Sequence, residues 1–163
     1  MTAVPVFEQL TATLDYPMVI VTTAANGVRA GCLAGFGSQC SIDPSRWGIW
    51  LSKQNHTHRI AANADVLAVH ILRERDIDLA HLFGEHSSDD IDKFAQCKWS
   101  EGPGGVPVLD GVDYFAGAIV EREGTGDHTL HVLAVLGEGR AERASEPQLG
   151  FQQVKDFEPG HDA

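Results

Sequence analysis

Residues 17–33 read PMVIVTTAANGVRAGCL, two apolar runs on either side of the dipeptide Asn26-Gly27. The first run is rich in β-branched residues, which favour strands. Asn-Gly between two such runs is a strong signal for a β-hairpin, because both residues tolerate the left-handed backbone that a tight hairpin turn requires. The stretch therefore predicts two antiparallel strands, the second of them over residues 28–33.

Beyond this hairpin, the chain shows further short apolar runs separated by turn residues and short helical patterns. Strands are expected over residues 47–52, 66–72, 114–123 and 128–137, the last two joined in a second hairpin by Gly124-Thr-Gly-Asp127. Helices are expected over residues 7–14, 57–62, 77–84 and 87–95, with Asn55 and Asp76 as N-caps and Gly84 closing the third. Residues 101–111 are expected to form a loop, and those from 145 onward a polar, peripheral tail.

Strands dominate this pattern, and the helices are inserted between them without regular alternation. A doubly wound parallel sheet needs regular alternation of strand and helix, so the pattern argues against a Rossmann-type fold. It favours a mainly β architecture, an antiparallel β-barrel with appended helices. We expect a single domain over residues 1–163, with its core at about 10–143 and a polar C-terminal tail over 144–163.

The composition narrows the function classes. At 163 residues, with 43% hydrophobic and 21% charged residues, the chain is long enough for one well-buried domain. Asp and Glu number 23 against 12 Lys and Arg, a net charge of −11, so the average field repels a polyanion and no nucleic-acid partner is expected. A small anion remains compatible with this charge, because a few local donors can outweigh the average.

The sequence also indicates a compartment. No apolar run reaches the length of a membrane span and no basic-then-apolar start resembles a signal peptide, so no membrane partner is expected. Cys32, Cys40 and Cys97 are sparse and have no CxxC spacing. Such a set fits reduced thiols in the cytoplasm, and Cys32 and Cys40 are interpreted as ordinary buried thiols rather than a redox pair.

The region after the first hairpin gathers the residues best suited to bind a ligand. A glycine-interrupted strand over 31–37 offers small residues against which a flat ligand can lie on bare backbone. After a turn over 39–44, the strand-to-helix junction at 52–59 collects Ser, Lys, Asn, Thr, His and Arg side chains. Lys53, Arg59 and the helix N-terminus suit a phosphate. The plain alternative is a capped surface helix with solvated charges.

Seven segments, in order within residues 10–143, carry a family resemblance. They are Gly31–Pro44, Leu51–Thr57, Leu67–Leu72, Leu79–Gly84, Asp92–Phe94, Gly105–Leu109 and Gly126–His128. Their order and spacing resemble the flavin reductase-like, FMN-binding split-barrel family. The resemblance implies an antiparallel split β-barrel of Greek-key type and a homodimer with flavin at or near its interface. It also implies a flavin reductase that reduces FMN, or FAD, with NADH or NADPH, often for a partner monooxygenase.

The resemblance assigns roles to residues by position. It implies that the flavin ring and ribityl chain are lined by Leu33, Ala34, Gly35 and Phe36, and that the polar edge of the ring is hydrogen-bonded by Gln39, Cys40 and Ser41. It implies that the phosphate is held by Lys53, Asn55, Thr57 and His58, and that a catalytic His128 lies close to flavin or nicotinamide. The chain departs from the family at residues 33–36, where the family commonly has Thr and paired Ser, so hydroxyl contacts to the flavin are missing there.

Other interpretations stay open. His128 follows a glycine-rich turn, so a turn histidine without a chemical role is the plain alternative. The histidines at 56, 58, 128 and 131 lack Cys or carboxylate partners at matching spacing, and no metal site is expected. Trp50 and His70 lie in apolar strands and are expected in the core or at a dimer interface. For the whole protein, the alternatives are a flavin carrier without turnover and a split-barrel reductase that uses a deazaflavin.

Overall fold

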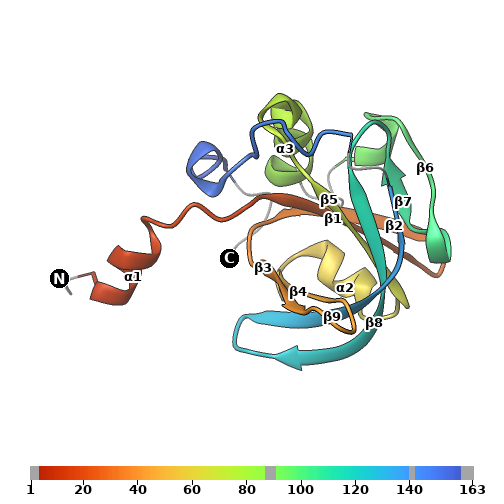
Figure 1. The fold of residues 1–163 in the computed structure, drawn as a ribbon, viewed down its shortest axis with the longest axis horizontal. Helices are drawn as coiled ribbons and strands as arrows, with labels where there is room; N and C mark the ends of the chain where they lie inside the picture. Colours follow the sequence, from red (N-terminus) through yellow and green to blue (C-terminus); the bar gives the residue numbers. More distant parts are fainter. Residues whose placement is uncertain (1–3, 87–90, 140–141, 159–163) are drawn as a thin grey trace.

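The computed structural model describes residues 4–86, 91–139 and 142–158. A curled sheet of seven strands forms the body (Figure 1). In spatial order the strands are β2 (Val28–Ala34), β1 (Val19–Ala25), β5 (Val66–Ile71), β8 (Tyr114–Gly124), β9 (His128–Glu138), β4 (Arg46–Ser52) and β3 (Gly37–Ser41). Every neighbouring pair is antiparallel, which confirms the mainly β, antiparallel architecture with appended helices.

The hairpin predicted from Asn26-Gly27 is present and sets the register of β1 and β2. Asn26 and Gly27 have φ values of 52° and 79°, the left-handed conformations that a tight hairpin turn requires. From this turn the strands pair without interruption as far as Val19 opposite Ala34. The second predicted hairpin joins β8 to β9 through residues 125–127.

Helices lie on both faces of the curled sheet (Figure 1). α2 (His56–Ala61) lies inside the curl against β1, β2 and β4, whereas α3 (Ile77–Glu85) packs on the other face, beside β2. α1 (Val6–Thr11) stands away from the body. A small second sheet pairs β6 (Trp99–Glu101) with β7 (Pro107–Leu109), and short 3₁₀ helices span Glu74–Asp76, Lys93–Ala95, Pro103–Gly105 and Phe151–Gln153.

Side chains of a strand alternate between faces, so β1 contributes to two hydrophobic clusters. Val19 and Val21 pack inside the curl, in a cluster completed by Cys32, Ala34, Ile49, Leu51, Ala61, Leu67, Val69 and Leu133. Met18 and Ile20 pack on the other face, in a cluster completed by Leu72, Ala80, Phe83, Phe94, Leu109, Val112, Leu149 and Val154. The end of β2 borders both clusters, because Leu33 packs against the second and Ala34 belongs to the first.

His70 of β5 is fully buried, as expected for a core histidine. Its Nδ1 lies 3.0 Å from the carbonyl of Ile20, and the N–H of Leu109 donates to its Nε2 at 3.0 Å. Because Nε2 must accept, Nδ1 carries the ring's single proton and donates it to Ile20. Burial accordingly lowers the pKa of His70 to about 4.

The C-terminal segment packs against the body, so the expectation of a peripheral polar tail is wrong. Leu149 and Val154 are buried in the cluster beside α3. Gly150 forms a β-bridge with Pro17, and the N–H of Gln152 donates to Asp15 at 2.9 Å. The apolar residues of this segment follow neither a helical nor a strand period, and they dock on residues far away in the sequence. Periodicity therefore carried no signal for them.

Several local predictions also differ from the structure. Residues 37–41 form strand β3 where the sequence predicts a turn over 39–44, and the expected loop over 101–111 contains β7 and a 3₁₀ turn. α1 ends at Thr11 rather than at residue 14, and α3 runs one residue past Gly84. Of the helix expected over 87–95, residues 87–90 lie outside the described ranges, and Lys93–Ala95 forms one 3₁₀ turn. Short strands with few apolar residues lack the patterns on which the predictions rest.

Candidate functional site

A cleft opens where β2 leads into β3, beside the end of β4 and the start of β9. Its inner part is a 190 Å³ cavity lined by residues 32–36 and 50–52, by Asn55 and His128, and by Tyr16, Met18 and Phe151. An outer cavity of 440 Å³ is lined by Tyr16, residues 36–38, Trp50, Thr125, Asp127 and His128. The two cavities share Tyr16, Phe36, Trp50 and His128 and are therefore parts of one cleft.

Short-range features of the chain bring these side chains together. Phe36 belongs to the two-residue link between β2 and β3, and the N–H of Trp50 donates to its carbonyl at 2.8 Å. Ser52 and His128 are direct partners in the pairing of β4 with β9. Asn55 caps α2 as predicted, since its Oδ1 accepts from the N–H of Thr57 at 2.8 Å. The ends of four strands, β2, β3, β4 and β9, and the start of one helix thus meet at the cleft.

Aromatic rings form one wall of the cleft. The ring centroids of Tyr16 and Phe36 are 5.6 Å apart, and those of Tyr16 and Phe151 are 5.9 Å apart, both in edge-to-face geometry. The rings of Phe36 and His128 are 5.1 Å apart. An apolar cleft with aromatic walls suits a flat aromatic ligand.

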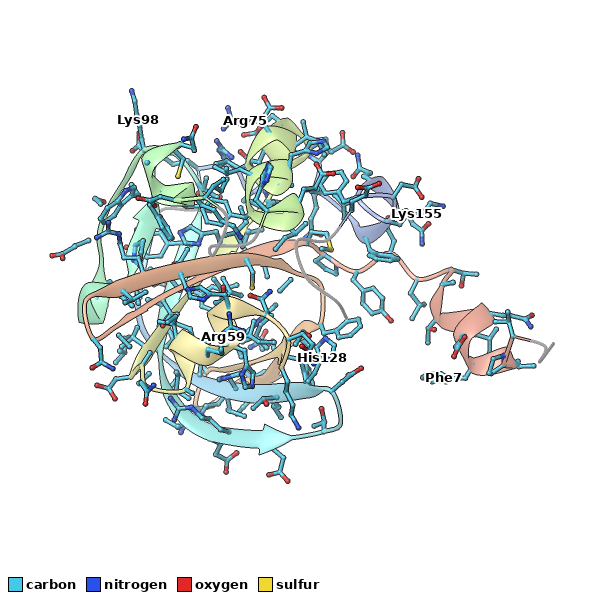
Figure 2. The ribbon with its side chains drawn as sticks, turned by 180° about the vertical axis from the view of Figure 1, so that it is seen from behind. Phe7, Arg59, Arg75, Lys98, His128 and Lys155 are labelled. Atoms are coloured by element: carbon cyan, nitrogen blue, oxygen red, sulfur yellow. The ribbon has the colours of Figure 1, made fainter. Side chains whose placement is uncertain are left out.

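His128, labelled in Figure 2, is the first residue of β9 and lines both cavities of this cleft. Its Nδ1 lies 2.6 Å from Oδ1 of Asp127, and the two side chains are 23% and 76% exposed. The hydrogen bond from His128 lowers the pKa of Asp127, so this carboxylate is charged and holds Nδ1–H as a donor. The imidazole therefore has a fixed orientation at the edge of the cleft.

The start of α2 gives the cleft a polar end. Thr57 is fully buried, and its hydroxyl has no hydrogen-bond partner of normal geometry among the described residues, the nearby Cys32 thiol being a weak one. His58 Nε2 lies 2.8 Å from the hydroxyl of Thr129. Lys53 is exposed, and its backbone N–H donates to Asp127 at 2.9 Å. A buried hydroxyl without a good partner is costly, so Thr57 is suited to meet an acceptor on a ligand.

Positive groups gather at this end of an otherwise acidic protein. The pKa of His58 is lowered, first by burial and then by Lys53, Arg59 and His128. Figure 2 shows Arg59 and His128 on the same side of the molecule. Two side chains that are always cationic at neutral pH, Lys53 and Arg59, therefore repel a charge on His58 in a protein whose net charge is −11. An anion bound here would relieve that repulsion.

Cys32 lines the inner cavity, and Lys93 is a charged neighbour of Cys32 that does not itself line the cleft. The Lys93 side chain is 3% exposed, and its ammonium donates to the carbonyls of Gly31 at 2.9 Å and Phe83 at 3.0 Å. Burial lowers the pKa of Lys93 and raises the pKa of the Cys32 thiol. Attraction between the charged forms of the two groups opposes both shifts but is the smaller effect. Cys32 is therefore a neutral thiol, and it is not paired with Cys40, in agreement with the sequence interpretation. The expectation that both thiols are buried is wrong for Cys40, which is exposed because it lies on the edge strand β3.

The structure brings part of the predicted site together. Cleft residues among those predicted are Leu33, Ala34, Gly35, Phe36, Asn55 and His128. Lys53, Thr57 and His58 adjoin the cleft at the start of α2. The structure does not bring Gln39, Cys40 and Ser41 to the cavity walls, because the predicted turn is strand β3 and only its first residues, Gly37 and Ser38, border the cleft. Gln39 donates to the carbonyl of Ser41 at 3.2 Å.

Several residues that line the inner cavity were not assigned to the site from the sequence, and four of them have large side chains at its wall. They are Tyr16, Met18, Trp50 and Phe151. Trp50, expected in the core or at an interface, stands two residues before Ser52 on one strand, so the two share a face, and this spacing could have revealed it. Tyr16 and Phe151 come from segments near the two ends of the chain, and no local pattern links them.

A larger hollow of 680 Å³ lies elsewhere, with Arg75 and Arg143 among its lining residues. Figure 2 shows Arg75 beside α3, well away from His128. Arg143 is already paired with Asp76 at 2.6 Å, and Arg75 with Glu146 at 2.8 Å. Because its cations are engaged by carboxylates of the same chain, this hollow is the weaker candidate despite its size.

Within residues 4–86, 91–139 and 142–158, no three His, Cys, Asp or Glu side chains are grouped as metal ligands would be. Over the same ranges, no helix combines the length and the apolar character that crossing a bilayer requires.

The fold and the cleft place this chain in a known class. It belongs to the family defined by the flavin reductase like domain, whose model matches residues 11–158. This finding confirms the family and the split-barrel fold expected from the sequence.

Particular relatives are similar to this chain. A ferric-chelate reductase (NAD(P)H) from Archaeoglobus fulgidus is 28% identical over 122 residues, 73% of this chain and 72% of that protein. The reductase component of a flavin-dependent trigonelline monooxygenase from Acinetobacter baylyi is 27% identical over 113 residues, 69% of this chain and 36% of that protein. The structure of an NADH:FAD oxidoreductase from Streptomyces globisporus matches with a TM-score of 0.77 and 20% identity, covering 91% of this chain and 90% of that one.

Proposed function

We propose that this protein reduces flavin, FMN in the first place and FAD as the alternative, with NADH or NADPH as the hydride donor. The observation that carries the proposal is the two-part character of the cleft, aromatic at Phe36 and Trp50, and polar and cationic at the start of α2. A flavin nucleotide has the same character, a planar ring joined to an anionic phosphate. Family membership and the reductase names of the relatives support the same activity.

The residues of the chain have two tasks, binding and orientation. When bound, the flavin supplies the ring that accepts hydride from the nicotinamide. Ala34 and Gly35 give the ring a flat backing of backbone, and the rings of Tyr16 and Trp50 exclude water from it. His128 holds the nicotinamide at the rim, where a positioned contact favours the near-attack geometry.

The polar end of the cleft holds the phosphate in this proposal. Thr57 offers a buried hydroxyl that lacks a good partner in the chain, and Asn55 keeps the start of α2 in place through its cap. Lys53 supplies positive charge, and the His58 ring, whose lowered pKa keeps it neutral, supplies a hydrogen-bonding group. These groups would hold FMN and FAD alike, because both carry phosphate in this position relative to the ring.

Titration of the purified protein with flavins tests the proposal directly. We expect FMN or FAD to bind with a change in flavin absorbance, and NADH or NADPH then to be oxidised with flavin present. Flavin binding without nicotinamide oxidation would make the protein a carrier. Binding of a deazaflavin, with neither FMN nor FAD bound, would assign it to the deazaflavin reductases.

Removal of the phosphate contacts should weaken flavin binding. In the double variant Lys53→Glu/Thr57→Ala, we expect the Kd for FMN to rise by about a hundredfold, since two charge-assisted or buried hydrogen bonds are lost. Stability should change little, by less than about 1 kcal/mol, because Lys53 is exposed and the Thr57 hydroxyl has no good partner to lose. Fluorescence titration and urea unfolding measure the two quantities.

The matched control for this charge change is Lys155→Glu. Lys155 is exposed and lies on the C-terminal segment, away from α2 (Figure 2). It should leave the FMN titration unchanged. An unaltered FMN titration curve for the double variant itself would show that the phosphate is not bound at the start of α2.

We also propose that the protein is a homodimer. The curled sheet ends in two edge strands, β2 and β3, and α1 buries none of its residues, with Phe7 74% exposed and Leu10 63% exposed. A two-fold partner would cover such edges and apolar side chains. Light scattering at micromolar concentration should give twice the mass of the chain, and a stable monomer would contradict the proposal.

A flavin reductase of this kind can supply a second enzyme with reduced flavin, and we propose a monooxygenase as that partner. Support comes from the relative that is the reductase component of a monooxygenase. Three unpaired cysteines, Cys32, Cys40 and Cys97, are consistent with a cytoplasmic location for this exchange.

A further inference from the structure

Phe36 occupies the border between the two cavities of the cleft. Together with Tyr16, Trp50 and His128 it lines both the inner cavity of 190 Å³ and the outer cavity of 440 Å³. Its ring lies between two others, with centroids 5.6 Å from Tyr16 and 5.1 Å from His128. The aromatic row across the cleft is therefore Tyr16, Phe36 and His128, with Phe36 in the middle.

The backbone of Phe36 is held, whereas its side chain is not enclosed. Its carbonyl accepts from the N–H of Trp50 at 2.8 Å, which anchors the link between β2 and β3 to β4. The residue is nevertheless 47% exposed, among the most exposed large apolar residues of the sheet and its links. A half-exposed ring on a fixed backbone can change its side-chain rotamer quickly, without breaking a backbone hydrogen bond.

The inner cavity is too small for a flavin unless the Phe36 ring moves. At 190 Å³ the inner cavity is smaller than the roughly 300–1,000 Å³ that small-molecule sites usually offer. A three-ring flavin cannot be enclosed by the inner cavity alone, and it must extend through the border into the outer one. With Phe36 in the position seen here, that border is narrowed by its ring.

We propose that Phe36 is the gate of the flavin site: its ring stands between Tyr16 and His128 at the border of the two cavities, and it must swing aside before a flavin ring can enter. The inference rests on the proposed function and adds a residue that controls access and selects for ligands able to displace it.

The gate predicts a specific kinetic effect. A site that is open for only a fraction of the time binds ligand more slowly by that fraction, and minor states of about a tenth are common. Phe36→Ala, which removes the ring, should therefore raise the association rate constant of FMN by about tenfold. The dissociation rate constant should rise as well, because the same ring closes over the bound flavin.

Stopped-flow fluorescence of FMN mixed with excess protein measures both constants without any turnover. Val120→Ala is the matched control, since Val120 is also 47% exposed and apolar but lies on β8 outside the cleft, and its constants should equal those of the wild type. Phe36→Tyr keeps the ring and should bind at the wild-type rate. Should Phe36→Ala fail to fold, Phe36→Leu, which lacks the flat ring, should still bind several-fold faster.

The outcomes separate the gate from the function on which it rests. Wild-type protein that binds neither FMN nor FAD would overturn the proposed function. If the wild-type protein binds FMN and Phe36→Ala has the same association rate constant as the wild type, the gate is overturned and the proposed function stands. A rise in the dissociation rate constant of Phe36→Ala without a rise in its association rate constant would also overturn the gate. Phe36 would then be only a wall against which the bound flavin ring packs.

Discussion

Replacing His128 with alanine should slow the reduction of bound flavin by NADH or NADPH by about ten- to a hundredfold, while leaving flavin affinity and folding almost unchanged. His128 lines both cavities at the rim, and the carboxylate of Asp127, 2.6 Å from its Nδ1, fixes the orientation of its ring. The phosphate contacts proposed at Lys53 and Thr57 are made by other side chains, so loss of the imidazole removes a contact to the nicotinamide but not the anchor of the flavin.

Stopped-flow absorbance of flavin-loaded protein mixed with excess NADH, and separately with NADPH, measures this rate. The matched control is His86→Ala, because His86 is an exposed histidine at the end of α3, outside the cleft. It should leave both rates unchanged. Wild-type rates in the His128 variant would reduce His128 to a residue of the hairpin turn. Loss of flavin from that variant would instead make it part of the flavin-binding site.

A second large effect is expected on stability in acid. The free energy of unfolding should fall as the pH drops from about 6.5 to about 4, because burial lowers the pKa of both His70 and His131 from 6.5 to about 4. In this range the unfolded chain binds protons at these histidines and the folded chain does not, so lower pH favours unfolding. Above pH 6.5 both histidines are neutral in the folded and the unfolded chain, and the free energy of unfolding has its full value. Protonation of the unfolded chain at His70 alone lowers that free energy by about 3 kcal/mol by pH 4.

Protonation of His70 is costly for a visible reason. A second ring proton would sit on Nε2, which already accepts the N–H of Leu109 at 3.0 Å, and two donors would then face each other in a buried place. His70→Leu should lose about 2–4 kcal/mol at pH 7.5, since it leaves the groups of Ile20 and Leu109 without partners. Its stability should also depend less on pH.

Urea unfolding at pH 7.5 and pH 5 measures both effects, with His86→Ala as the exposed control. The difference between the two pH values should be smaller in His70→Leu than in the wild type. The same pH dependence in both proteins would show that His70 does not carry the acid sensitivity.

Where the signals of the fold are local, the sequence was enough to predict it. Asn26-Gly27 forms a hairpin turn because of its own backbone preferences. Asn55 caps α2 with a hydrogen bond to Thr57, only two residues further along the chain. The prediction failed where a segment is ordered by distant contacts. The segment 147–157 has no period of its own and is held by Pro17, Asp15 and the cluster around Phe83.

The same distinction applies to the site. The stretch 33–36 and Asn55 lie on contiguous pieces of chain whose residue types already suggest a ligand, and the structure places them at the cleft. Gln39, Cys40 and Ser41 were assigned only through the resemblance, in a stretch expected to form a turn, but they belong to strand β3, which pairs with β4, and they do not line the cavities. Tyr16 and Phe151 escaped prediction because the wall they form exists only after the fold brings them within 5.9 Å.

The aromatic wall formed by Tyr16 and Phe151 has a consequence for folding during translation. Gln152, next to Phe151, is hydrogen-bonded to Asp15 across 137 positions of chain, beside Tyr16. The barrel strands can pair as soon as β9 has emerged, but the aromatic wall stays unfinished until translation has passed residue 151 and that segment has left the exit tunnel. A nascent chain should thus acquire its sheet before it acquires a complete cleft, which delays cofactor capture until synthesis of this domain is almost finished.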